Sequence, residues 1–265
     1  MALLVFMMGA SVFSFLNVVA YRSVKKESYI KGRSYCPECG HELAAKDLIP
    51  VISFITLAGK CRYCKKPIPV RDTIFEIVGG LLLLATLIKA VTDANFDLYT
   101  ADNAAYCKLI SRVVVMFLFF SMLDVVSLID MAIMEIKNRH VAIVFAIAVA
   151  AVFVMPEITL AERVIGAFSV SIPMLVIALI IPGGFGGGDI KFMIPVGFML
   201  GFKLALTGFF FAILGGGIYG VFLLATKRAD KKSHFAFGPF LCLGMTISLL
   251  FGGRILNAYF GMFRI

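Results

Sequence analysis

The sequence contains no tryptophan, and charged residues occupy only 15% of its 265 positions. Hydrophobic residues make up 61%, and the mean hydropathy of +0.98 lies far above that of ordinary soluble domains. So little charge excludes a soluble globular protein and predicts a chain that crosses a membrane several times. Without tryptophan, the residues that mark the membrane interfaces must be Tyr, Phe, Lys and Arg.

Acidic residues are scarcer than basic ones, 16 against 25, which gives a formal net charge of +9. The surplus is concentrated in one stretch, 21–72, which holds eleven basic and five acidic residues. Cytoplasmic loops of membrane proteins are enriched in Lys and Arg. We therefore expect 21–72 to be cytoplasmic, with membrane lipid headgroups as its incidental anionic partners and no nucleic acid as a partner.

The first apolar run lacks both a basic segment before it and a convincing cleavage site after it. A removed signal peptide would carry both, so we expect a retained first span. A membrane helix needs about 20 mostly apolar residues. Eight stretches approach that requirement: 3–20, 73–92, 110–130, 140–156, 162–182, 190–206, 207–226 and 238–256.

These stretches predict an all-α polytopic membrane protein with about eight transmembrane helices. The long apolar tract 190–226 must contain a hairpin, which we place near Gly201. With 21–72 in the cytoplasm, both termini lie outside. Asp130, at the end of the third span, and Asp189, at the start of the sixth, then emerge on the same cytoplasmic face.

Four cysteines form two Cys-x₂-Cys knuckles separated by twenty-one residues: Cys36, Cys39, Cys61 and Cys64. This spacing is typical of a four-thiolate structural zinc site, which would fold a loop too short to build its own core. The alternative is two disulfides, which a reducing cytoplasm disfavours. The other two cysteines, Cys107 and Cys242, have no such partners.

An ionisable residue in or beside a membrane span is costly and points to function. We expect Asp130 and Asp189 to pair, so that one carboxyl keeps a proton while the other activates a water molecule. Asp124 lies on the same helix as Asp130 but about 9 Å deeper, at about 1.5 Å per residue. It is therefore less well placed to meet Asp189.

The glycine-rich segment 182–188 precedes Asp189. Glycines allow the backbone to adopt φ > 0 and to approach a substrate closely. The same segment is equally consistent with a flexible loop in which Asp189 caps the following helix. A phosphate-binding loop is disfavoured, because no Gly-Lys-Ser/Thr follows the glycines and no soluble βαβ context surrounds them.

Six segments in a fixed order carry a family resemblance: 14–22, 36–41, 47–53, 59–64, 186–191 and 237–241. Together they resemble the type IV prepilin peptidases, which are membrane aspartic proteases of the Gly-x-Gly-Asp class. In that family the first catalytic aspartate precedes a segment Asp-x₅-Ile-Pro. Here Asp130 is followed by Ile136, with Lys137 replacing the proline, so the match selects Asp130 over Asp124.

The resemblance implies removal of the short basic leader from type IV prepilin or pseudopilin precursors at the cytoplasmic face of the bacterial inner membrane. It implies Asp130 and Asp189 as catalytic residues and a structural zinc ion on the four knuckle cysteines. It also implies methylation of the new N-terminus with S-adenosylmethionine, although the residues of 21–72 show no methyl-donor site. The expected parts are a first transmembrane helix (1–20), a cytoplasmic zinc-binding loop domain (21–72) and a transmembrane peptidase domain (73–265).

Two other classes of function compete with this interpretation. A proton-coupled transporter could use intramembrane carboxylates and a broken helix at the glycines, but such transporters carry paired repeats and only one break is present. A metal-scaffolded membrane assembly factor would need no catalysis. Cleavage of a pilin precursor by the purified protein separates the three.

Overall fold

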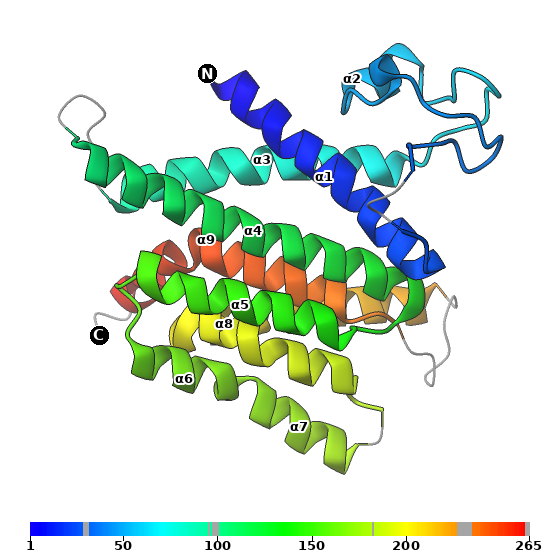
Figure 1. Ribbon diagram of the computed structural model, residues 1–265. Coiled ribbons are helices and arrows are strands. Elements are labelled where there is room, and N and C mark those ends of the chain that lie inside the picture. The colour runs from blue at the N-terminus through cyan, green and yellow to red at the C-terminus, as the bar shows by residue number, and fades with distance from the viewer. Residues whose placement is uncertain (29–31, 95, 97–100, 182, 227–234, 263–265) are drawn as a thin grey trace. The chain divides into compact units, whose positions relative to one another are not determined.

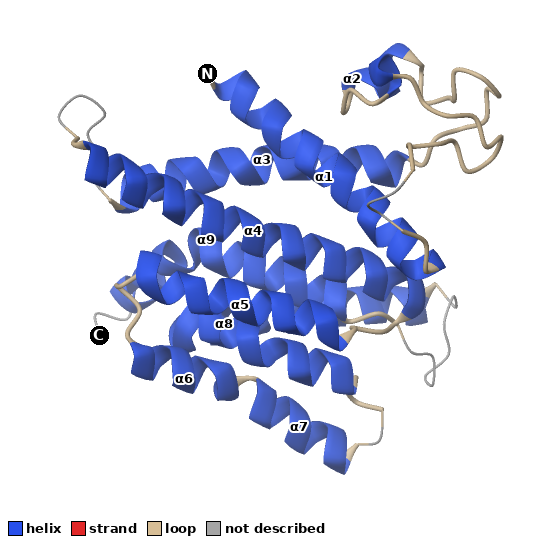
Figure 2. Cartoon of the chain, in the orientation of Figure 1, coloured by secondary structure: helices blue, strands red, loops and turns tan. Residues whose placement is uncertain are grey.

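The computed structural model describes residues 1–28, 32–94, 96, 101–181, 183–226 and 235–262. Within these ranges the regular structure is helical, and the only β pairing is two isolated bridges (Figure 2). The prediction of an all-α protein is therefore confirmed.

The chain forms two compact units, Met1–Asp97 and Leu98–Ile265, each of which is a set of helices (Figure 1). The first unit contains α1 (Ala2–Lys25), the 3₁₀ turn η1 (Ala45–Asp47), α2 (Ile52–Thr56) and α3 (Val70–Asp93). The second contains α4 (Asn103–Ile133), α5 (Asn138–Val154), α6 (Leu160–Ser169), α7 (Ser171–Ile180), α8 (Gly187–Ala225) and α9 (Gly238–Met262).

In the first unit α1 and α3 pack through residues without side chains. A Cβ added to Gly9 would lie 2.5 Å from the carbonyl oxygen of Gly79, and one added to Gly79 would lie 2.2 Å from the ring of Phe13. Lipid tails are as apolar as leucine, so close packing of small residues is what holds such helices together. The two helices thus form a tight hairpin whose connecting loop carries the cysteines.

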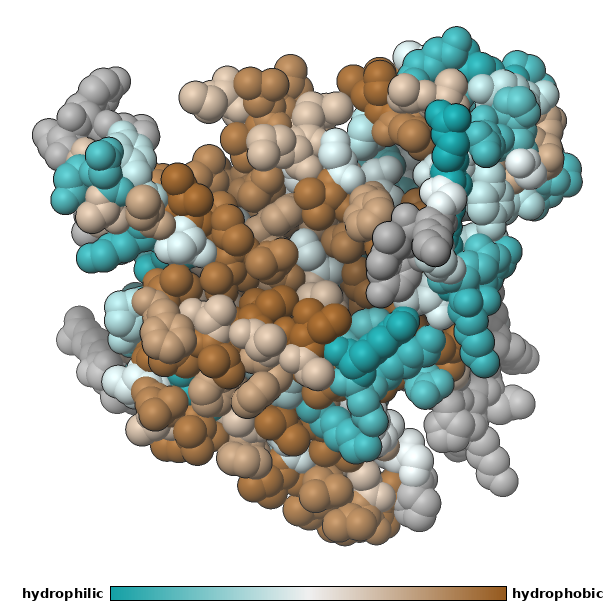
Figure 3. Space-filling view, viewed as in Figure 1, coloured by the Kyte–Doolittle hydropathy of each residue, from teal (hydrophilic) through white to brown (hydrophobic). Residues whose placement is uncertain are grey.

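Six of the described helical segments are long and apolar enough to cross a membrane: α1, α3, α4, α6 with α7, α8 and α9. Much of the molecular face drawn in Figure 3 is hydrophobic, as lipid contact requires. The expected eight spans are not confirmed, for two reasons. Helix α5 has only 17 residues, and the segments expected at 190–206 and 207–226 both fall within α8.

Helix α8 is divided at Gly201, whose φ of 75° and ψ of 170° are not helical. The ring of Phe185, just before α8, lies 6.3 Å from that of Phe209. A straight helix would separate residues 24 positions apart by about 36 Å. The chain therefore doubles back at Gly201, where we expected a hairpin, and gives α8 a first limb (187–200) and a second limb (202–225).

Each limb of α8 packs against a different helix through glycines. In the first limb, a Cβ on Gly197 would lie 2.2 Å from the carbonyl oxygen of Gly166 in α6. In the second limb, the carbonyl oxygen of Gly208 would lie 2.2 Å from a Cβ on Gly244 in α9. In both pairs the closest atoms belong to the backbone, so neither Gly197 nor Gly244 has room for a side chain.

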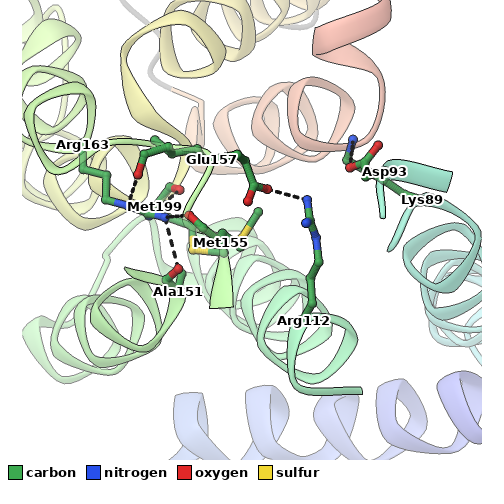
Figure 4. A network of polar contacts seen from close by, with 9 residues as sticks. Lys89, Asp93, Arg112, Ala151, Met155, Glu157, Arg163 and Met199 are labelled. Atoms are coloured by element: carbon green, nitrogen blue, oxygen red, sulfur yellow. Dashed lines mark hydrogen bonds and ion pairs between the residues drawn. The ribbon is translucent and has the colours of Figure 1, made fainter. Parts of the chain in front are cut away.

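Arg163 in α6 is completely buried and holds together the ends of the helices around the α8 reversal (Figure 4). Its guanidinium donates to the carbonyl oxygens of Ala151 at 3.1 Å, Met155 at 2.8 Å, Ile158 at 3.2 Å and Met199 at 3.3 Å. The last carbonyls of a helix have no partner within that helix. At the end of α5 the carbonyl oxygens of Ala151 and Met155 also accept backbone N–H groups, at 2.9 and 3.4 Å, so Arg163 adds a second donor there. It also donates to the carbonyl at the end of the first α8 limb.

Candidate active site and metal centre

Asp130 lies in the last turn of α4, where its carbonyl oxygen accepts the N–H of Met134 at 2.8 Å. Met134 adopts the left-handed conformation, with φ of 51°, and ends the helix. The Asp130 side chain is buried, and its Oδ2 accepts the backbone N–H of Gly238 at 2.9 Å. Gly238 begins α9, so the partial positive charge of that helix end faces a carboxylate.

This contact requires glycine at position 238, because a side chain there would collide with Asp130. A Cβ there would lie 2.6 Å from Asp130 Oδ2, closer than real Cβ atoms come to any atom. From the sequence, the segment 237–241 was noted only as part of the family resemblance. The contact between Gly238 and Asp130 was not predicted. A Gly-Pro pair opening an apolar helix signals a helix start, but nothing local shows that the glycine faces an aspartate 108 residues away.

Asp189 is the third residue of α8 and is also buried. Its carboxylate accepts a hydrogen bond from the backbone N–H of Gly186, the residue that caps this helix. A carboxylate at this position that reaches back to the capping residue forms half of a capping box. The alternative in which Asp189 itself caps the helix is wrong, because Gly186 is the capping residue and Asp189 lies three positions later. The contact with Gly186 holds the carboxylate at the start of α8.

The segments that adjoin the two aspartates pack on each other and on the segment before α9. Gly188 lies against Ile136, to which a Cβ on the glycine would come within 3.2 Å. The rings of Phe185 and Phe237 lie 5.5 Å apart. The structure therefore brings Asp130 and Asp189 to one end of the second unit, near enough for their charges to interact.

Asp124 lies six residues before Asp130 on α4 and is also buried. Its Oδ2 has no hydrogen-bond partner in the described part of the chain. Asp124 thus differs from Asp130, whose Oδ2 accepts a backbone N–H.

In the first unit, the first cysteine knuckle closes a small antiparallel turn. Cys36 N–H donates to the carbonyl oxygen of His41 at 3.0 Å, and Gly40 N–H donates to that of Cys36 at 2.8 Å. Tyr35 and Glu42 form a β bridge at its base.

The second knuckle repeats this geometry. Cys61 N–H donates to the carbonyl oxygen of Lys66 at 2.8 Å, and Lys65 N–H donates to that of Cys61 at 3.0 Å. Lys65 has φ of 61° and Gly40 has φ of 69°, so both turns close through a left-handed residue. Two knuckles of one form thus contribute two sulfurs each.

The four Sγ atoms of Cys36, Cys39, Cys61 and Cys64 lie within 4.8 Å of one another. The Sγ atoms of Cys36 and Cys64 are 3.9 Å apart. A zinc–sulfur bond of about 2.3 Å places the sulfurs of a tetrahedral site about 3.8 Å apart. The cluster can therefore hold a metal ion of this kind, and none of the cysteines, all of which are described, forms a disulfide.

Backbone N–H groups of Cys64 and Tyr63 lower the pKa of Cys61 to about 7, whereas burial and the neighbouring thiols raise the pKa of Cys64 to about 11. Of these two cysteines, Cys61 therefore forms the metal-binding thiolate more readily. Asp47 connects this knuckle to the rest of the loop. Its Oδ1 accepts from Arg62 Nε at 2.7 Å, and its Oδ2 accepts from the Tyr63 hydroxyl at 3.2 Å. Although burial raises the pKa of Asp47, these bonds and one from Ala44 N–H hold it below its usual range.

Comparison with known proteins places these features in a family. Residues 7–90 match the family model described as the bacterial peptidase A24 N-terminal domain, and residues 117–221 match the type IV leader peptidase family. A prepilin leader peptidase/N-methyltransferase of Bacillus subtilis is 30% identical over 98% of both chains. One from Pseudomonas aeruginosa is 25% identical over 96% of this chain and 91% of its own.

A third relative of the same name, from Myxococcus xanthus, is 44% identical but matches only 32% of this chain and 26% of its own. No solved structure was found to match. Both family models fall on the segments that carry the two knuckles and the two aspartates, and full-length similarity extends over the rest. The chain belongs to the type IV leader peptidase family.

Proposed function

We propose that this protein is a membrane aspartic endopeptidase that removes the leader from type IV prepilin or pseudopilin precursors, with Asp130 and Asp189 as its catalytic residues. The observation that carries the proposal is the convergence of two buried carboxylates from α4 and α8 at one end of the second unit, each held by a backbone N–H. The family membership and the names of its relatives supply the substrate class.

The chemistry follows from two interacting carboxylates. Like charges in one site do not both ionise easily, so one carboxyl retains a proton while the other accepts a proton from water. The water oxygen attacks the peptide carbonyl, and the protonated carboxyl donates to that carbonyl oxygen. Collapse of the tetrahedral intermediate breaks the C–N bond, and the amine leaves with a proton from the dyad. Water is the only co-reactant.

We assign zinc to the four-cysteine cluster, because the donor set is all thiolate and the sulfur separation agrees with zinc–sulfur bonds. Four protein ligands leave no open position on a tetrahedral ion. Its role is structural: it would fix the two knuckles of a loop that buries little apolar surface of its own. The loop domain 21–72 is accordingly proposed as a folding element separate from helix 1–20 and from the peptidase part, 73–265.

We place the aspartates at the cytoplasmic face of the bacterial inner membrane, supported by the basic surplus of 21–72. The proposed topology has eight crossings, in which α5 and both limbs of α8 each span the bilayer. The reversal at Gly201 supports it, because a chain that doubles back returns Asp189 and the end of α8 to one side. In this topology, membrane lipid contacts most of the helical surface.

We further propose that the chain methylates the new N-terminus with S-adenosylmethionine as donor. Support for this second activity comes from the names of the relatives rather than from any residue of this chain.

The reaction class is tested by incubating the purified protein in lipid vesicles with a pilin precursor and determining the N-terminal sequence and mass of the product. We expect one cut, after the glycine that ends the leader. With S-adenosylmethionine present, the product should be heavier by one methylene than the bare peptide. An uncut precursor, in a preparation that retains its zinc and its helical content, would contradict the peptidase proposal, and a cut but unmethylated product would contradict only the second activity.

A further inference from the structure

Four large aliphatic side chains are exposed on the polar loop between α1 and α3. Leu48 is 46% exposed, Ile49 41%, Ile52 48% and Ile55 68%. Single exposed aliphatic residues are common, but four within eight positions form a patch that marks an interaction surface. We call these four residues the 48–55 patch. The cysteine cluster and the aspartates make no use of it.

A hydrogen bond fixes the depth of this patch relative to α3. The backbone N–H of Val51, in the middle of the patch, donates to Glu76 Oε2 at 2.8 Å. Glu76 lies in the second turn of α3, a helix of 24 residues with the composition of a membrane span. That helix is about 36 Å long and a hydrocarbon core is about 30 Å thick. Its second turn therefore lies at the edge of the hydrocarbon, and so does Val51.

The backbone conformation of Val51 indicates that the surrounding structure imposes its hydrogen bond to Glu76. Val51 has φ of 61° and ψ of −49°. A β-branched residue rarely adopts positive φ, and such strain persists only where the surroundings impose it. In sequence, two of the patch residues precede the strained Val51 and two follow it.

The charge around the patch suits an anionic lipid surface. Lys46 and Lys60, which precede and follow the patch in sequence, are both exposed. They belong to the stretch 21–72, with its eleven basic and five acidic residues. Basic residues beside a membrane are attracted to anionic headgroups at about 1 kcal/mol each.

We propose that the 48–55 patch inserts into the headgroup region of the bilayer that α1 and α3 cross, and so attaches the cysteine loop to the membrane surface as an interfacial segment. The ligand is a lipid surface containing anionic headgroups. Apolar side chains enter the boundary between headgroups and acyl chains, and Lys46 and Lys60 contact phosphates, as in other proteins that lie in a membrane interface.

The lack of native tryptophan makes a direct test possible. Ile52→Trp and Ile55→Trp variants of the full chain, each with one tryptophan, are reconstituted in vesicles of anionic and zwitterionic lipids brominated near the headgroup end of the acyl chain. We expect a blue-shifted emission maximum and quenching by the brominated lipid. Ile74→Trp, on the exposed side of α3, is the control within a span, and Glu42→Trp, exposed on the first knuckle, is the control outside the patch.

Emission of the position 52 and 55 variants at the wavelength of water-exposed tryptophan, without quenching, would overturn the proposal if Ile74→Trp is quenched. That result would assign the patch to a protein partner. Equal quenching at positions 42, 52 and 55 would also contradict it, because the patch would not be a distinct contact face.

A second comparison tests the role of Glu76. In the Ile55→Trp background, Glu76→Gln retains an oxygen that can accept from Val51 N–H, whereas Glu76→Leu does not. We expect quenching to persist with Gln and to fall with Leu. Unchanged quenching with Leu would show that Glu76 does not set the depth of the patch.

Discussion

At the scale of single residues, the orientation of Asp130 depends on a residue without a side chain. Gly238 brings its N–H to 2.9 Å from Asp130 Oδ2 and leaves no room for a Cβ. A hydrogen bond to a charged group contributes about 1.5–3 kcal/mol. This contact leaves Oδ1 available for water or substrate, which is the arrangement that a paired carboxylate needs.

Gly238→Ala should therefore reduce the cleavage rate by about tenfold to a hundredfold, since 1.4 kcal/mol corresponds to about a factor of ten. The rate is measured from the appearance of cleaved precursor in vesicles. Gly217→Ala is the matched control, because a Cβ added there meets nothing within 4 Å. A Gly238→Ala protein as fast as Gly217→Ala would show that this contact does not orient the catalytic carboxylate.

The residues that could be predicted from the sequence are those whose chemistry is local. Spacing alone was enough to group the four cysteines, and an aspartate after glycines at the edge of an apolar run pointed to Asp189. The partners that fix these groups were not predictable: Gly186 binds Asp189 through its backbone, and Gly238 meets Asp130 only after the chain has crossed the unit. Every residue except proline carries a backbone N–H, so no pattern of side chains marks the ones that donate to these aspartates.

At the scale of elements, the reversal of α8 is stabilised from outside the helix. Gly201 supplies the positive φ, and a hairpin near this glycine was predicted from the length of the apolar tract. Arg163 was not predicted, although a charged pair, Glu162 and Arg163, at the start of an expected span is a signal that could have drawn attention to it. Which carbonyls it would reach depends on the packing of α5, α6 and α8.

Arg163→Met should lower the free energy of unfolding by about 3 kcal/mol. The carbonyl oxygens of Ile158 and Met199 lose the guanidinium donor, at about 1–3 kcal/mol each, whereas those of Ala151 and Met155 keep a backbone N–H. Thermal unfolding in detergent, followed by loss of helical signal, measures the effect. Arg254→Met, at an exposed position of α9, is the control. Equal midpoints for the two variants would mean that the carbonyls at these helix ends find other partners.

At the scale of the whole molecule, the metal knuckles and the aspartates belong to different units of the chain. The stability of the first unit should depend on pH through Asp47. Its lowered pKa means that the folded loop binds this proton less tightly than the unfolded chain does. The stabilisation is therefore complete above the unfolded value of about 3.9 and is lost as the pH falls through the folded value.

Asp47→Asn should lose zinc to a chelator more readily than the unsubstituted protein at pH 7, and the difference should shrink as the pH falls below about 4. Metal analysis after dialysis against chelator at a series of pH values gives the comparison. Glu42→Gln, which removes an ion pair between exposed side chains, should behave like the unsubstituted protein at every pH. A pH-independent difference for Asp47→Asn would exclude its ionisation as the cause.

Asp130 and Asp189 are proposed to act together in one hydrolytic step, and the cleavage rates of single and double asparagine variants measure whether they do. Residues that act as a unit are not additive. We expect Asp130→Asn and Asp189→Asn each to abolish cleavage in protein that still inserts. The double variant should be no worse, and Asp124→Asn should still cleave. Cleavage at the normal rate by either single variant would show that the two aspartates do not act as a catalytic pair, and loss of cleavage in Asp124→Asn with activity retained in Asp130→Asn would assign the catalytic role to Asp124.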